Sequence, residues 1–188
     1  MTLKRSLAPV LALAALAQAS AAQAQAQQPC VPPADLGDTI IYALPIAYDA
    51  ARTSCAREFA RDGFVARGGE KFIAGFRARQ NAAWPGAMRT VQAFLSGQQN
   101  DGKGGDLDMA ALAKSLPPEA LRPLVDGLMG QMIAGEIKPE ACSKIERGLE
   151  LMSPLPVDNV AGLMGFVLEL ADVKEPSICP ADLARKKR

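Results

Sequence analysis

The fold is decided by the stretch from Pro117 to Ile133, which reads PPEALRPLVDGLMGQMI. Two prolines and Glu119 open it, and proline followed by an acid in the first turn is typical of a helix start. Apolar side chains then recur at the i, i+3, i+4 spacing that one face of an α-helix produces. They are Leu121, Leu124, Val125, Leu128, Met129, Met132 and Ile133. The pattern predicts a helix whose apolar stripe is buried against the rest of the protein.

The residues that follow predict two more helices. Lys138-Pro139-Glu140 opens the first of them, and Pro154 and Pro156 end it. Asp158 can cap the second, which contains residues 160–171 and is apolar nearly all round. A helix without a polar face belongs in the centre of a bundle, so we expect it there. The methionines of these segments fall on the apolar stripes and are expected to pack in the core: Met129, Met132, Met152 and Met164.

Helical spacing also dominates the first half of the chain. Apolar residues from Thr39 to Phe59 predict one helix, which Pro45 should kink or split. A short helix is expected from about Glu70 to Ala82, followed by a turn at Trp84-Pro85-Gly86 and a further helix over residues 87–95. Residues 97–105 are polar and rich in glycine, which predicts a loop. No alternating run persists, so we expect no strands.

The first 26 residues have the order of a secretory signal peptide. Lys4 and Arg5 precede an apolar run from Leu7 to Ala17, and Ala24-Gln25-Ala26 is the best cleavage triplet. The run is too short for a membrane anchor, which needs about 20 residues. We therefore expect cleavage after residue 26 and a periplasmic or secreted protein, with no transmembrane segment in the mature chain. The basic residues 181–188 are expected to form a flexible tail.

Four cysteines in an exported chain favour two disulfides: Cys30, Cys55, Cys142 and Cys179. We favour Cys30–Cys55 with Cys142–Cys179, because antiparallel packing of the last two helices would bring the second pair together. The nested pairing, Cys30–Cys179 with Cys55–Cys142, is the main alternative. The sequence thus predicts an all-α fold: a compact helical bundle of about five to seven helices, stapled by two disulfides, in a single domain over residues 27–180.

The absence of histidine limits the chemistry that the chain can perform. A Ser-His-Asp triad is excluded, and the commonest metal ligand and general base are missing. We expect no metal site and no cofactor. The stretch from Asn100 to Asp108 resembles a calcium loop, but Gly102, Gly104 and Ala111 stand where oxygen ligands belong.

Paired carboxylates can catalyse hydrolysis without histidine. Glu146 and Glu150 share one helix face, but Lys144 and Arg147 lie beside them, and solvated ion pairs explain that face better. A small carboxylate-dependent hydrolase of the cell envelope is therefore an alternative, not the main hypothesis. A carrier of a small hydrophobic ligand is a further alternative.

The charges are uneven along the chain. The segment 52–89 carries three acids and eight basic residues: Arg52, Arg57, Arg61, Arg67, Lys71, Arg77, Arg79 and Arg89. These residues are candidates for binding an anionic partner, either an acidic envelope component or an acidic protein. Export argues against nucleic acid. The alternative is that they pack against the acidic second half of the same chain.

The sequence leaves the function open. We expect an exported binding or interaction protein without catalysis, because neither a nucleophile motif nor a set of metal ligands accompanies the predicted core.

Overall fold

The computed structural model describes residues 30–100, 115–171, 173 and 177–180. Within them the chain forms five α-helices and no strand, so the predicted all-α bundle with two disulfides is confirmed. The helices are α2 (Pro33–Ser54), α3 (Glu70–Asn100), α5 (Pro118–Glu136), α6 (Cys142–Met152) and α7 (Val157–Leu170), with a π-helix η2 (Val65–Gly69) before α3 and a 3-10 helix η3 (Pro139–Ala141) before α6. The predicted signal peptide, the calcium-like stretch after Asn100 and the basic tail lie outside the described residues.

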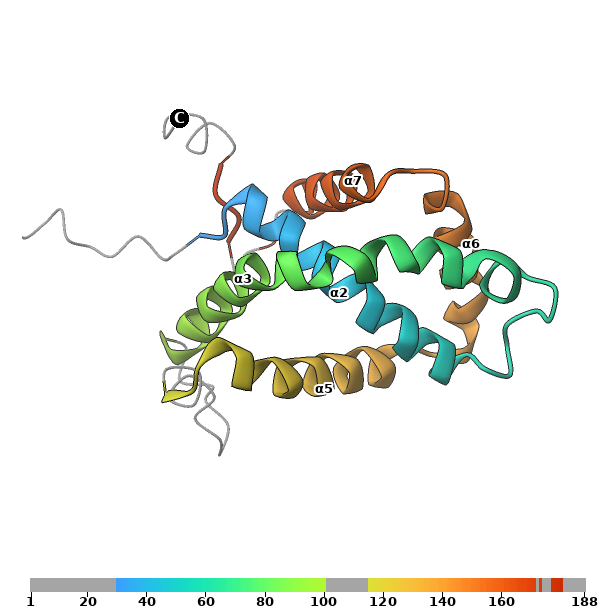
Figure 1. Cartoon of the computed structure of the whole chain (residues 1–188), viewed down its shortest axis with the longest axis horizontal. Coiled ribbons are helices and arrows are strands. Elements are labelled where there is room, and N and C mark those ends of the chain that lie inside the picture. The colour runs from blue at the N-terminus through green and yellow to red at the C-terminus, as the bar shows by residue number, and fades with distance from the viewer. Residues whose placement is uncertain (1–29, 101–114, 172, 174–176, 181–188) are drawn as a thin grey trace, which may run out of the picture.

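Helix α2 is the centre of the bundle. It contacts α3, α5 and α7, and α5 and α7 lie on opposite sides of it (Figure 1). No side chain from Ile40 to Tyr48 is exposed. The prediction that the last helix would be central is wrong, because α7 fully buries only Val160, Ala161 and Gly165. Helix α2 has 22 residues and α7 has 14, so the longer helix reaches more neighbours.

Three helices contain an internal proline and continue past it. Pro45 lies within α2, Pro85 within α3 and Pro123 within α5. Of the two outcomes expected at Pro45, a kink or a split, the split does not occur, and the expected turn around Pro85 is wrong. In α3, the buried side chains of Trp84 and Met88 hold the helix on either side of Pro85. This packing outweighs the one helical hydrogen bond that a proline removes.

A polar contact fixes the crossing of α2 and α3. Two guanidinium nitrogens of Arg89 donate to the Asp35 carboxylate, Nε at 2.9 Å and Nη2 at 2.6 Å. The neighbouring Asp38 carboxylate lies so close to α3 that a Cβ at Gly86 would overlap it. Burial, together with the charge of Asp35, raises the pKa of Asp38. Glycine at position 86 is thus required by close approach of the two helices.

The disulfides are nested, so the favoured pairing is wrong and its alternative is right. Cys30 bonds to Cys179, and Cys55 bonds to Cys142. Cys30 precedes α2 and Cys55 follows it, and a 22-residue helix is about 33 Å long, which is too far for a disulfide. Helix α6 packs against η2 and η3 instead of forming the expected antiparallel pair with α7. A short parallel bridge between Val31 and Ile178 joins the two ends of the domain beside the outer disulfide.

Candidate functional site

A groove of about 530 Å³ lies between α2, α3 and α5. Apolar residues and polar residues both line it, as in most sites for small ligands. The apolar lining consists of Pro45, Ile46, Ala50, Gly130 and Ala134, and the polar lining of Asp49, Thr53, Arg77, Gln80, Asp126 and Gln131. Three helices that are distant in sequence form this groove, so no local sequence motif could predict it.

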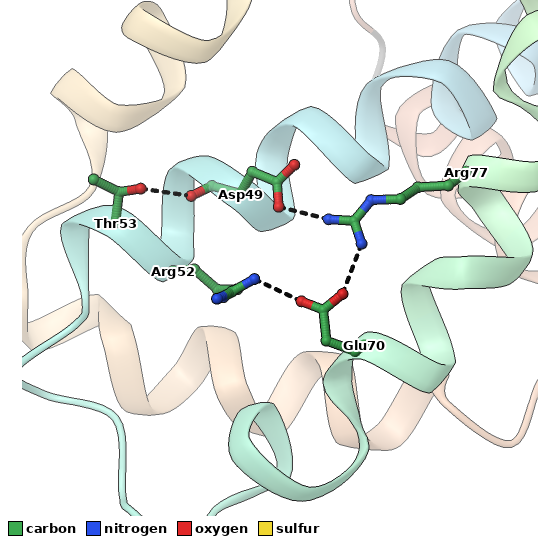
Figure 2. Close-up of polar contacts among 5 residues, drawn as sticks. All are labelled: Asp49, Arg52, Thr53, Glu70 and Arg77. Carbon is green, nitrogen blue, oxygen red and sulfur yellow. Dashed lines mark hydrogen bonds and ion pairs between the residues drawn. The ribbon is translucent and has the colours of Figure 1, made fainter.

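One wall of the groove is held by a chain of ion pairs (Figure 2). The Arg77 guanidinium donates to Asp49 Oδ1 at 2.7 Å and to Glu70 Oε2 at 2.7 Å. The second Glu70 oxygen accepts from Arg52 Nη1 at 2.6 Å. The hydrogen bond from Arg77 holds the pKa of Glu70 below its usual value. Among the described residues, Arg77 is the only cation on the groove lining, and the carboxylates of Asp49 and Glu70 already neutralise its charge.

Tyr48 lies beneath this chain of ion pairs. The guanidinium carbons of Arg52 and Arg77 each lie 5.9 Å from the centre of its ring, which suits a cation–π contact. The Tyr48 hydroxyl is buried beside the Glu70 carboxylate. It lies against the backbone of Gly69, where any Cβ would overlap it. Burial, followed by the charge of Glu70, raises the pKa of Tyr48.

A second polar cluster lies at the other end of the groove. The Tyr42 hydroxyl donates a hydrogen bond to Asp126 Oδ1, and the Gln80 side-chain amide donates to the Tyr42 carbonyl at 3.0 Å. Arg122 stacks over Tyr42 at 5.4 Å and over Trp84 at 5.9 Å, and the two rings are 4.9 Å apart. Burial and the hydrogen bond to Asp126 raise the pKa of Tyr42 well above its ordinary value. Asp126 is thereby fixed on the lining of the groove.

These tyrosines predict a specific response to alkaline pH. They are the two tyrosines of the chain, and the pKa of each is raised in the folded state. A raised pKa means that the unfolded chain loses these protons first, so stability is complete below about pH 10 and falls as the pH rises above it. We expect absorbance at 295 nm to show no tyrosinate near pH 10 until the protein unfolds. The chain in concentrated urea is the control, and a folded-state titration step near pH 10 would contradict the burial of both hydroxyls.

The structure divides the eight candidate anion-binding residues into two groups. Four are paired within the bundle: Arg52, Arg77, Arg79 with Asp158 at 2.7 Å, and Arg89 with Asp35. The other four are exposed and have no ion pair among the described residues: Arg57, Arg61, Arg67 and Lys71. All four lie between the end of α2 and the first turn of α3. Binding of an anionic partner at these four positions stays a prediction.

The carboxylates of α6 have a structural contact. Glu146 Oε1 accepts the backbone N–H of Val65 at 3.0 Å, at the first residue of η2. The expectation that Glu146 belongs to a purely solvated ion pair is therefore wrong, whereas Glu150 is exposed. Among the described residues, no group of three or more Cys, Asp or Glu side chains is placed to hold a metal ion.

The outer face of α7 is a feature that the sequence analysis missed. Leu163 is 51% exposed, Phe166 and Val167 are each 54% exposed, and Leu170 is 69% exposed. Their spacing of i, i+3, i+4 and i+7 places them on one face of the helix. The expected burial of this helix is thus correct only for its inner face. The sequence did carry a signal for this exposed face. A helix that is apolar all round fits a helix that packs on the bundle with one side and binds a partner with the other.

Helix α5 shows a second, weaker apolar face. Leu121 is buried as predicted, but Leu124 and Leu128 are 36% and 39% exposed and Met132 is 70% exposed. The predicted stripe was too wide, because only one edge of it meets α2. The expectation that all four methionines pack in the core is wrong for Met132, whereas Met152 and Met164 pack against it.

Comparisons with protein-family models, with curated proteins and with solved structures find no match for this chain. In the part of the chain that the structure describes, no helix has both the length and the apolar character needed to cross a membrane.

Proposed function

We propose that this chain is an exported interaction protein without catalysis, and that it binds another protein through the outer face of α7. Leu163, Phe166, Val167 and Leu170 form this face, which is called the α7 face below. Its exposure is the observation that carries the proposal. Export rests on the N-terminal sequence, and the two disulfides are typical of proteins outside the reducing cytoplasm.

The inner side of α7 is already packed against α2. A Cβ at Gly165 would lie 3.6 Å from Leu36 and 3.8 Å from Ile40, so this side packs closely on α2. Monomeric soluble proteins rarely expose a contiguous apolar patch larger than roughly a few hundred Å², and such large patches often mark interaction sites. Burial of the exposed halves of four large apolar side chains would contribute roughly 4 kcal/mol to binding. A gain of this size supports a specific function for the α7 face.

The charges around the α7 face favour a protein partner with a basic rim. Helix α7 contains two acids, Asp158 and Glu169, and neither lysine nor arginine. Asp158 is paired with Arg79 of α3, so Glu169 is the acid of α7 without an ion pair among the described residues. Amphipathic helices that lie on anionic lipid surfaces carry lysine and arginine on their polar side. An apolar protein surface flanked by basic residues complements α7 better than an anionic membrane does.

The two alternative functions have less support. Asp49 is engaged by Arg77, and Asp126 by the hydroxyl of Tyr42, so each carboxylate on the groove has a structural partner. A second, almost wholly apolar pocket lies between α2 and α6, but its volume is about 230 Å³. Sites for drug-sized ligands usually measure about 300–1,000 Å³. A hydrolase or a carrier of hydrophobic ligands therefore ranks behind an interaction protein.

Site-specific photo-cross-linking in the living cell tests this proposal. A photoreactive amino acid at position 166 should cross-link a protein whose contacting peptide combines apolar residues with flanking lysine or arginine. Phe166→Glu should reduce binding of that protein at least tenfold, because large apolar residues at the centre of an interface carry most of its energy. A photoreactive residue at Ala60, an exposed position between α2 and η2, should not give this product.

Met132→Glu is the matched control, since it places the same charge on the exposed apolar face of α5. This variant should retain the cross-link from position 166. A cross-link to a second copy of the chain, to lipid or to another segment of the same chain would overturn the proposal. Equal loss in Met132→Glu and Phe166→Glu would also overturn it.

A further inference from the structure

We infer that the groove between α2, α3 and α5 binds an organic cation, namely a primary ammonium or guanidinium group on a short alkyl chain. This site is separate from the α7 face and does not depend on the function proposed for that face. The volume of the groove, about 530 Å³, lies in the range of small-molecule sites. The inference follows from the charges, the hydrogen-bonding groups and the apolar lining of the groove.

The groove lining carries one carboxylate, that of Asp126, without an ion pair among the described residues. Asp49, Glu70, Arg52 and Arg77 neutralise one another along the wall shown in Figure 2. Asp126 is left on the lining, and the group that donates to it is the neutral hydroxyl of Tyr42. Arg122, one helical turn earlier on α5, stacks over aromatic rings and forms no ion pair with Asp126 in the described part of the chain. A bound cation would pair directly with the Asp126 carboxylate.

The free hydrogen-bonding groups of the groove favour a ligand that donates. Gln80 uses its amide nitrogen to bond the Tyr42 carbonyl, so its carbonyl oxygen remains as an acceptor. Thr53 donates its hydroxyl proton to the Asp49 carbonyl at 3.0 Å and keeps its acceptor capacity (Figure 2). Arg77 already donates to two carboxylates. An ammonium or guanidinium group, which only donates, complements these acceptors and the Asp126 carboxylate.

The apolar lining accounts for the alkyl chain of the ligand. Pro45, Ile46 and Ala50 of α2 face Gly130 and Ala134 of α5 across the groove. Alkyl groups gain about 0.8 kcal/mol for each CH₂ that such a surface buries. Gly130 lines the groove without a side chain. A Cβ there would meet only Ile46, at an ordinary 3.7 Å, so a larger side chain at this position can be accommodated and would occupy the groove.

The experiment uses three probes of similar size, n-pentylamine, n-pentanol and pentanoate, and one larger probe, the methylamide of Nα-acetyl-lysine. Binding is followed by shifts of the side-chain amide NMR signals of Gln80 and Gln131. We expect pentylamine to bind at millimolar concentration, pentanol to bind at least tenfold more weakly, and pentanoate not to bind. If the natural ligand is a lysine side chain of a peptide, the lysine derivative will bind more tightly than pentylamine. The reverse order indicates a free amine.

Two variants and one control locate the site. Asp126→Asn should weaken pentylamine binding at least tenfold. Gly130→Leu should abolish binding by filling the groove. This variant leaves intact the hydrogen bond between Tyr42 and Asp126, which Asp126→Asn perturbs. Gly135→Leu makes the same change on the same helix, outside the groove lining and where a Cβ meets open space, and should keep full affinity. No pentylamine binding, equal binding of pentanoate, or unchanged binding in Gly130→Leu would overturn the inference.

Discussion

Loss of both disulfides should unfold this protein at room temperature. The closed loops have sequence separations of 149 residues for Cys30–Cys179 and 87 residues for Cys55–Cys142. In the chain-entropy treatment, loops of this size each stabilise the fold by about 4–5 kcal/mol. A domain of this size has a total stability of only about 5–15 kcal/mol. After reduction, the helical circular dichroism signal at room temperature should be largely lost without urea, whereas the oxidised protein should keep it until urea is added.

The two pairs should differ when each is removed separately. Cys55 and Cys142 are 0% and 1% exposed, whereas Cys30 and Cys179 are partly exposed. Replacing the inner pair with alanine therefore loses core packing as well as the cross-link, and should cost about 1 kcal/mol more than replacing the outer pair. Mapping of non-reduced peptides is the control, because it should link Cys30 to Cys179. Finding Cys30 linked to Cys55 would contradict the nested arrangement.

The error in pairing came from the expected antiparallel pair of the last two helices, which does not form, and from the start of α2. We expected this helix to begin at Thr39, because the helical spacing of apolar residues starts there. The helix begins at Pro33, and the start signal was the proline pair at positions 32 and 33. The same signal at positions 117 and 118 was correctly interpreted for α5. A start at Pro33 places the two cysteines at opposite ends of a long helix, which excludes their bond.

Other features could not be predicted from sequence because they depend on distant partners. Asp35 is buried within α2 because Arg89, 54 residues away, donates to it twice. The Tyr42 hydroxyl donates to Asp126, which is 84 residues away in the sequence. A one-dimensional pattern shows which residues are apolar, but it does not show which polar residues will be neutralised. The same limit applies to the groove, whose lining comes from three helices.

A second large effect is expected from truncation of the aromatic core. Phe76 of α3 is 1% exposed, and its ring meets that of Phe72 edge-on, with centroids 5.3 Å apart. Phe72 meets Phe64 in the same way at 6.3 Å, so the row of rings joins α3 to the segment before η2. Phe76→Ala removes a fully buried ring and leaves a cavity, which costs about 3–5 kcal/mol. The loss of the ring pair accounts for about 0.5–1.5 kcal/mol of the total.

Phe94→Ala is the matched control, since it makes the same change on the same helix at a side chain that is 37% exposed. It should cost about 1 kcal/mol or less, because water already covers part of that ring. Urea unfolding of both variants with the disulfides intact measures the difference directly. Because the cross-links remain closed in both variants, any gap between them reports packing. If the two variants lost equal stability, the row of phenylalanines would not be part of the core, and the bundle would depend on its disulfides far more than on α3.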